Sequence, residues 1–189
     1  YAADFPFVYT PEDLILLSPY LGSPTNNIKS PLTEWVDKAC PSGEKIQTYA
    51  ILQRLCCLIQ QEMSYRTREE PGVQSPIETL SCRTGSCRDF ANLFMAATRH
   101  LGLAARFVSG YLHAPPSALD LGATHAWAEV YLPGAGWKGF DPTIGQIVGT
   151  EHIAVTVAML PESVPPIAGS FIGPPGASLD VGVWVSKLE

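Results

Sequence analysis

The stretch from Cys87 to His100 has the periodicity of an amphipathic helix, and a cysteine occupies its first position. Gly85 and Ser86 lead into it, and Gly102 follows at the position that ends a helix. A thiol in the first turn faces the positive end of the helix dipole and backbone N–H groups without intrahelical partners. Both favour the thiolate, the nucleophilic form of cysteine. The sequence therefore predicts a reactive thiol where a helix begins.

The cysteine also shares the side of this helix that packs inward. Helical spacing places on that side Cys87, Phe90, Ala91, Phe94, Thr98 and Leu101. The opposite side carries Arg88, Asn92 and Arg99. We therefore expect the sulfur to face the layer formed by the strands that follow.

The chain divides into a helical half and a sheet-forming half. Capping signals and apolar periodicity predict helices over 31–39 and 44–63, and a short helix from position 76. Alternating apolar patterns predict strands over 105–112, 124–132, 137–141, 153–157 and 179–185. This order indicates an α+β fold, with N-terminal helices packed on an antiparallel sheet.

Charge and composition exclude several classes of partner. The 189-residue chain has a net charge of −6 and lacks the basic field that attracts nucleic acid. No run approaches the roughly 18 apolar residues of a membrane span. Five cysteines without a CxxC pair argue against zinc and a disulfide framework, and favour reduced thiols in the cytoplasm. Because the chain begins with tyrosine, we expect a fragment or processed form, with an upstream targeting segment left open.

The other cysteines are weaker candidates for the nucleophile. Cys82 has a similar Ser-Cys-Arg context, but we expect it in the loop before the helix, where the dipole does not act on it. Cys56 falls on the apolar stripe of the 44–63 helix and is expected in the core. Cys40 and Cys57 have no distinguishing context.

Among the four histidines, His125 is the preferred base. It stands at the start of a predicted strand, and the small residues after it would let a helix approach closely. His152 begins another strand and is the weaker alternative base. His113 is expected in a loop, and His100 at a helix end where its charge favours the dipole.

Asp141 is the candidate carboxylate that would orient the imidazole. Aspartate before proline is also a common turn former, so a purely structural role stays open. A simple hairpin register centred on Gly134 and Ala135 places Asp141 opposite Ala128 rather than His125. Contact with His125 would then need a bulge, strong twist or a diagonal reach.

Four ordered blocks carry a family resemblance: GSCRDFA at 85–91, ARFVSGY at 105–111, THAWAEV at 124–130 and GFDPT at 139–143. Together they resemble the bacterial transglutaminase-like proteins, often described as candidate cysteine proteases. The resemblance implies a papain-like cysteine-proteinase fold, which is the transglutaminase core. It also implies Cys87 as nucleophile, His125 as base and Asp141 as the orienting carboxylate.

With this resemblance the expected organisation has three parts. Residues 1–30 are expected to be an extended lead-in, 31–160 the transglutaminase-like catalytic core, and 161–189 a Pro/Gly-rich connection with a terminal strand. Family members usually have a β-rich region before the core, which this chain lacks. The 179–185 strand is therefore an unpaired edge that could form a homodimer. The chain also reads AMLP at 158–161 where the family tends to have Gly-Arg-Asp-Tyr, which predicts a different specificity.

The expected activity is thiol-dependent acyl transfer on amide bonds of peptides or proteins, as in a cysteine peptidase or amidase. Two alternatives remain, protein-glutamine amine transfer by the same site and a non-catalytic peptide-binding module. The Cys87 backbone N–H, Tyr65 and Trp127 are the candidate oxyanion donors. No metal or organic cofactor is expected, and no EF-hand-like acidic loop suggests calcium binding.

Overall fold

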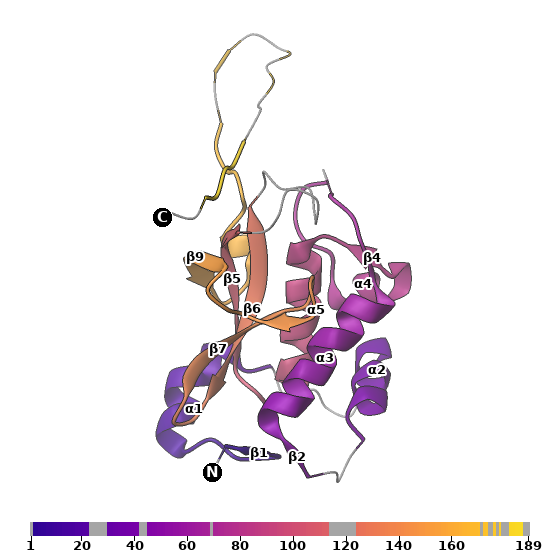
Figure 1. Cartoon of the computed structure of the whole chain (residues 1–189), viewed down its shortest axis with the longest axis vertical. Helices are drawn as coiled ribbons and strands as arrows, with labels where there is room; N and C mark the ends of the chain where they lie inside the picture. The colour runs from indigo at the N-terminus through magenta and orange to yellow at the C-terminus, as the bar shows by residue number, and fades with distance from the viewer. Residues whose placement is uncertain are drawn as a thin grey trace.

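The helices between residues 31 and 100 cover one side of an antiparallel sheet in this α+β protein, and the first helix lies on the other side (Figure 1). The computed structural model describes residues 2–22, 30–41, 45–68, 70–113, 124–170, 172–173, 176, 178 and 182–186. Its α-helices are α1 (Pro11–Leu17), α2 (Pro31–Ala39), α3 (Thr48–Glu62), α4 (Pro76–Cys82) and α5 (Cys87–His100). Two 3₁₀ turns are η1 (Ser18–Tyr20) and η2 (Pro161–Ser163).

Five strands form the main sheet, in the order β8-β7-β6-β5-β9 with every pair antiparallel. Their bounds are β5 (Ala105–Leu112), β6 (His125–Leu132), β7 (Gly136–Asp141), β8 (Gln146–Ile147) and β9 (His152–Ala158). Two short pairs lie outside it, β1 (Asp4–Phe5) with β2 (Ile46–Gln47) and β3 (Ser64–Tyr65) with β4 (Thr84–Gly85). The predicted helical half and sheet half are both confirmed.

The core lies between α3, α5 and the sheet. Phe94 of α5 stacks on Phe140 of β7, with ring centroids 5.6 Å apart. Ala126 and Ala128 of β6 belong to the same buried cluster, and their small side chains leave room for the α5 backbone. This packing fixes the start of α5 against the sheet, where the sequence placed the reactive thiol.

The β6–β7 register differs from the prediction by one residue. Ala128 pairs with Phe140, not with Asp141. The cause is a three-residue loop in which Pro133 and Gly134 occupy the turn centre, with φ +81° at Gly134. Because strand side chains alternate, this slip moves Asp141 onto the face that carries His125.

The lead-in is partly helical rather than extended. Thr10 caps α1, its hydroxyl accepting from the Asp13 N–H at 3.1 Å, and Pro11 occupies the first helical position. The buried Tyr9 hydroxyl donates to the Tyr131 carbonyl oxygen at 2.8 Å and accepts from the Ala104 N–H. This polar anchor ties the lead-in to the sheet.

Two other predicted elements differ. The long helix begins at Thr48 rather than Glu44, because Ile46 and Gln47 pair with β1, and residues 42–44 lie outside the described part. Of the predicted 179–185 strand, residues 179–181 lie outside that part, and 182–185 pair with nothing there.

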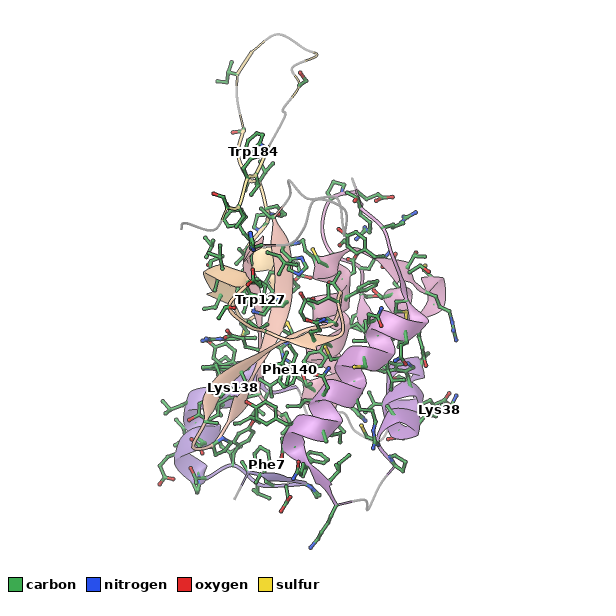
Figure 2. The ribbon with its side chains drawn as sticks, viewed as in Figure 1. Phe7, Lys38, Trp127, Lys138, Phe140 and Trp184 are labelled. Carbon is green, nitrogen blue, oxygen red and sulfur yellow. The ribbon has the colours of Figure 1, made fainter. Side chains whose placement is uncertain are left out.

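Trp184, in the segment that projects beyond the sheet, is 89% exposed (Figure 2). No strand forms over the described residues 182–186, so the homodimer stays a prediction. The edge strands of the main sheet in the described part are β8 and β9.

Candidate active site

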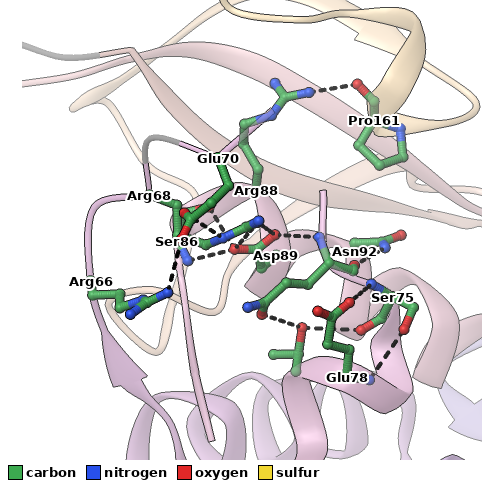
Figure 3. Close-up of polar contacts among 12 residues, drawn as sticks. Arg66, Arg68, Glu70, Ser75, Glu78, Ser86, Arg88, Asp89, Asn92 and Pro161 are labelled. Carbon is green, nitrogen blue, oxygen red and sulfur yellow. Dashed lines mark hydrogen bonds and ion pairs between the residues drawn. The ribbon is translucent and has the colours of Figure 1, made fainter. Parts of the chain in front are cut away.

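The first turn of α5 is held by the buried carboxylate of Asp89 (Figure 3). Its oxygens accept hydrogen bonds from the Ser86 backbone N–H (2.8 Å), the Ser86 hydroxyl (2.9 Å) and the Gln74 N–H (2.7 Å). Arg68 Nη1 reaches both oxygens, at 2.8 and 3.1 Å. The loop before α4 and the start of α5 thereby hydrogen bond to the same carboxylate.

Sequence reasoning missed Asp89, although a signal was present. Ser86 and Asp89 have the Ser-x-x-Asp spacing that marks a helix N-terminus. The position just before them, Gly85, has no room for a side chain, because an added Cβ would lie 2.9 Å from Asp89 Cβ. The local sequence therefore fixes the backbone that presents Cys87.

Replacing Asp89 with alanine should lower the free energy of unfolding by about 3–5 kcal/mol, because the mostly buried Arg68 loses its close carboxylate and keeps only the longer contact with the exposed Glu70. Three other donors lose their acceptor as well. Denaturant unfolding measures the change. The control is Glu70→Ala, since Glu70 pairs with the same arginine at 3.5 Å but its side chain is 59% exposed. That control should cost under about 1 kcal/mol; equal losses for the two variants would contradict the assignment.

Cys87 is the first residue of α5 and is 7% exposed. The competing Cys82 is exposed and ends α4 instead of lying in a loop, so it stands at the negative end of a helix dipole. Cys56 is fully buried as predicted, and burial, followed by the charges of Asp141 and Cys57, raises its pKa. Cys87 therefore has the most favourable setting of these three thiols.

His125 and Asp141 meet at the ends of adjacent strands. His125 Nε2 lies 2.6 Å from Asp141 Oδ2, the diagonal contact that the shifted register permits. The other carboxylate oxygen, Oδ1, accepts the Thr143 N–H at 2.9 Å. One oxygen of Asp141 thus accepts the N–H of the turn, and the other contacts the imidazole of His125.

The electrostatics of the pair favour two charges. Burial alone would lower the pKa of His125, but hydrogen bonds with Asp141 and Cys87 and the charges of both raise it to about 10. Burial would raise the pKa of Asp141, yet the hydrogen bonds from His125 and His152, the His125 charge and the Thr143 N–H hold it well below its usual range. Because Asp141 occupies Nε2, His125 has Nδ1 left for Cys87.

His152 is the residue whose place sequence reasoning missed. Considered only as an alternative base, it lies instead against the carboxylate, with Nε2 3.1 Å from Asp141 Oδ2. Its other nitrogen, Nδ1, accepts the Gly149 N–H at 3.3 Å. No local pattern predicts this contact, because β9 enters the sheet through long-range pairing with β5.

The three ligand atoms of His125, Asp141 and His152 lie within 4.8 Å of one another, a spacing that a metal ion could bridge. The hydrogen-bond polarity does not suit a metal. A ligating histidine usually donates its second N–H, whereas His152 Nδ1 accepts from Gly149, which leaves the proton of the neutral ring on Nε2. The arrangement suits a carboxylate that accepts hydrogen bonds from two imidazole rings.

The two side chains expected to stabilise an oxyanion differ in accessibility. Tyr65 is 37% exposed and pairs in register with Gly85, two residues before Cys87. Trp127 is 1% exposed, and its indole N–H has no hydrogen-bond partner among the described residues. Tyr65 is therefore the one open to a ligand.

No helix in the described ranges is both long and apolar enough to span a bilayer.

Comparison with known proteins places the chain in a family. The family model for the transglutaminase-like superfamily matches residues 39–142. The uncharacterized protein Rv2569c of Mycobacterium tuberculosis is 36% identical over 149 residues, which are 74% of this chain and 48% of that protein. The uncharacterized protein ML0607 of Mycobacterium leprae is 35% identical over 118 residues, which are 60% of this chain and 42% of that protein. The chain spans about half the length of the curated relatives it matches.

Solved structures share the fold. A candidate cysteine protease from Cytophaga hutchinsonii superposes with a TM-score of 0.61 at 25% identity, covering 84% of this chain and 51% of that one. The periplasmic domain of TgpA from Pseudomonas aeruginosa gives a TM-score of 0.53 at 24% identity, covering 70% and 48%. The predicted papain-like α+β fold is thus confirmed, and the chain belongs to the transglutaminase-like superfamily.

Proposed function

We propose that this protein transfers acyl groups from amide bonds of peptides or proteins through Cys87, His125 and Asp141. The observation that carries the proposal is the 2.6 Å contact between the buried Asp141 carboxylate and the His125 imidazole, whose pKa is raised, despite burial, by Asp141 and then by Cys87 at the helix start. A nucleophile, a base and an orienting group in this order are the parts of a thiol acyl-transfer site.

In the first half-reaction the Cys87 thiolate attacks the amide carbonyl carbon. The tetrahedral intermediate collapses as His125 gives its Nδ1 proton to the leaving nitrogen, which departs as an amine or ammonia. A thioester on Cys87 and a neutral His125 remain. The Asp141 carboxylate keeps the Nε2–H of the ring aligned throughout.

In the second half-reaction neutral His125 takes a proton from the incoming nucleophile, which attacks the thioester carbon. The Cys87 thiolate leaves and the imidazolium is restored. The Cys87 backbone N–H at the start of α5 is the main-chain candidate for the oxyanion, with Tyr65 and Trp127 as side-chain candidates. Tyr65 is favoured because it is the more exposed of the two. Losing one such donor typically costs about 10²–10³ in rate.

The incoming nucleophile decides between the two activities. Water gives a peptidase or amidase, and the candidate cysteine protease of Cytophaga hutchinsonii favours that outcome. A primary amine gives protein-glutamine amine transfer, which the same site can support. A non-catalytic peptide-binding module is the third reading, and the complete Cys-His-Asp set argues against it.

A product assay separates these readings. The protein is incubated with a mixed peptide library, with and without a labelled primary amine, and the products are identified by mass. New peptide termini indicate a peptidase, glutamine converted to glutamate indicates an amidase, and amine adducts with released ammonia indicate amine transfer. We expect new termini or glutamate. A library that stays unmodified under both conditions would contradict acyl transfer and favour the binding module.

A further inference from the structure

His152 is enclosed between the proposed site and the centre of the sheet. Its side chain is 4% exposed, and its ring packs edge-on against Trp127 with centroids 5.2 Å apart. The ring that faces it across the carboxylate is His125, at 6.2 Å between centroids. Both ring nitrogens of His152 are engaged, Nδ1 by the Gly149 N–H and Nε2 by Asp141, so His152 does not itself serve as a base.

We propose that His152 is a positioning residue, whose Nε2–H holds the Asp141 carboxylate toward His125. This inference rests on the proposed function and assigns a fourth residue to the same site. His152 touches no reacting atom, so it acts through Asp141 alone.

The hydrogen bond from the Gly149 backbone N–H determines which ring nitrogen of His152 carries the hydrogen. The Gly149 N–H donates to Nδ1, so in the neutral ring Nδ1 is the acceptor and Nε2 carries the hydrogen. Asp141 Oδ2, 3.1 Å from Nε2, can only accept. The adjacent Glu151 does not compete for this ring, because it pairs with His113.

The contribution of His152 follows from the hydrogen bonds of a fully buried carboxylate. Oδ1 has one donor, the Thr143 N–H, and Oδ2 has two, His125 and His152. Without His152 the side chain of Asp141 loses the second of the two donors to Oδ2. The carboxylate can then turn, and the imidazolium beside Cys87 loses part of its stabilisation.

Three variants at this position test the proposal. Glutamine places its amide N–H near the position of Nε2, whereas asparagine is too short and leucine has no donor. The probe is iodoacetamide, with the rate of Cys87 alkylation followed by mass across the pH range. For His152→Leu and His152→Asn we expect the acid midpoint of this profile to rise by about one pH unit, a tenfold change in ionisation of the Cys87–His125 pair. His152→Gln should stay close to the wild type.

Two results would overturn the proposal. One is a wild-type profile in all three variants. The other is an equal shift for glutamine and asparagine, which would indicate a packing effect only. Denaturant unfolding of each variant reports any general loss of stability.

A second measurement does not depend on thiol chemistry. Nitrogen-15 NMR of the histidine-labelled protein should show a hydrogen on Nε2 of His152, and a ring protonated only at Nδ1 would refute the inference. Failure of the proposed function has another signature, namely an ordinary thiol profile for Cys87 in the wild type itself. The two failures are therefore distinguishable.

Discussion

Replacement of Cys87 with alanine is expected to abolish acyl transfer, with kcat falling by about 10⁶-fold, the loss typical when a triad nucleophile is removed. No neighbouring thiol can substitute. Cys56 is fully buried with a raised pKa, and Cys82 lies at the far end of another helix. The measurement is the rate of product formation in the peptide assay.

The matched control is Cys82→Ala, which removes an exposed sulfur from the same chain. That variant should keep wild-type activity. Circular dichroism and thermal unfolding of Cys87→Ala establish that its fold is intact. Activity retained by Cys87→Ala would assign any observed turnover to another group and refute the mechanism.

Replacement of Asp141 with asparagine is expected to lower kcat by about 10⁴-fold, as in other triads whose orienting carboxylate becomes an amide. The amide can present its own N–H to His125 Nε2, which moves the ring proton to the wrong nitrogen. Glu151→Gln is the matched control, because it neutralises a different carboxylate paired with a histidine. The control should stay within about twofold of wild type. Equal losses of kcat in the two variants would mean that any lost negative charge has this effect, and would contradict an orienting role for Asp141.

The same variant should flatten the pH dependence of stability. The lowered pKa of Asp141 contributes stability above its ordinary pKa, near 3.8, which is lost as the pH falls further. The raised pKa of His125 contributes stability that is full below about 6.5 and disappears as the pH rises toward about 10. The difference between the unfolding free energies of wild type and Asp141→Asn should be largest between the ordinary pKa values of the two groups, 3.8 and 6.5, and should shrink on both sides of this interval. A difference in unfolding free energy that does not change with pH would contradict the electrostatic coupling between Asp141 and His125.

Local sequence signals predicted the parts of the site but not all of their contacts. Cys87 at a helix start and His125 at a strand start follow from capping and periodicity. The contact of His125 with Asp141 did not, because it depends on a loop one residue longer than the simple turn. The family resemblance supplied that pairing, and the structure supplies its geometry.

Other features depend on distant parts of the chain. His152 reaches Asp141 only because β9 pairs with β5 across a long connection, which no local pattern encodes. The 179–185 pattern has strand propensity, but a strand also needs a partner, and residues 182–185 have none in the described part. The helix of the lead-in was predictable, since Thr10 and Pro11 are a cap and a first-turn proline.

The central claim is that Cys87 is a nucleophile activated by the His125 imidazolium beside it, and the pH dependence of its alkylation tests this most directly. Comparing iodoacetamide rates at about pH 6 and pH 8 on the same 7%-exposed thiol cancels its limited accessibility. A free cysteine thiol gains about 75-fold over this interval, from its ordinary pKa of about 8.5. We predict a rise of less than about threefold for Cys87, because the raised pKa of His125 keeps a cation beside the sulfur at both pH values. A rise as steep as that of the free thiol would contradict the account.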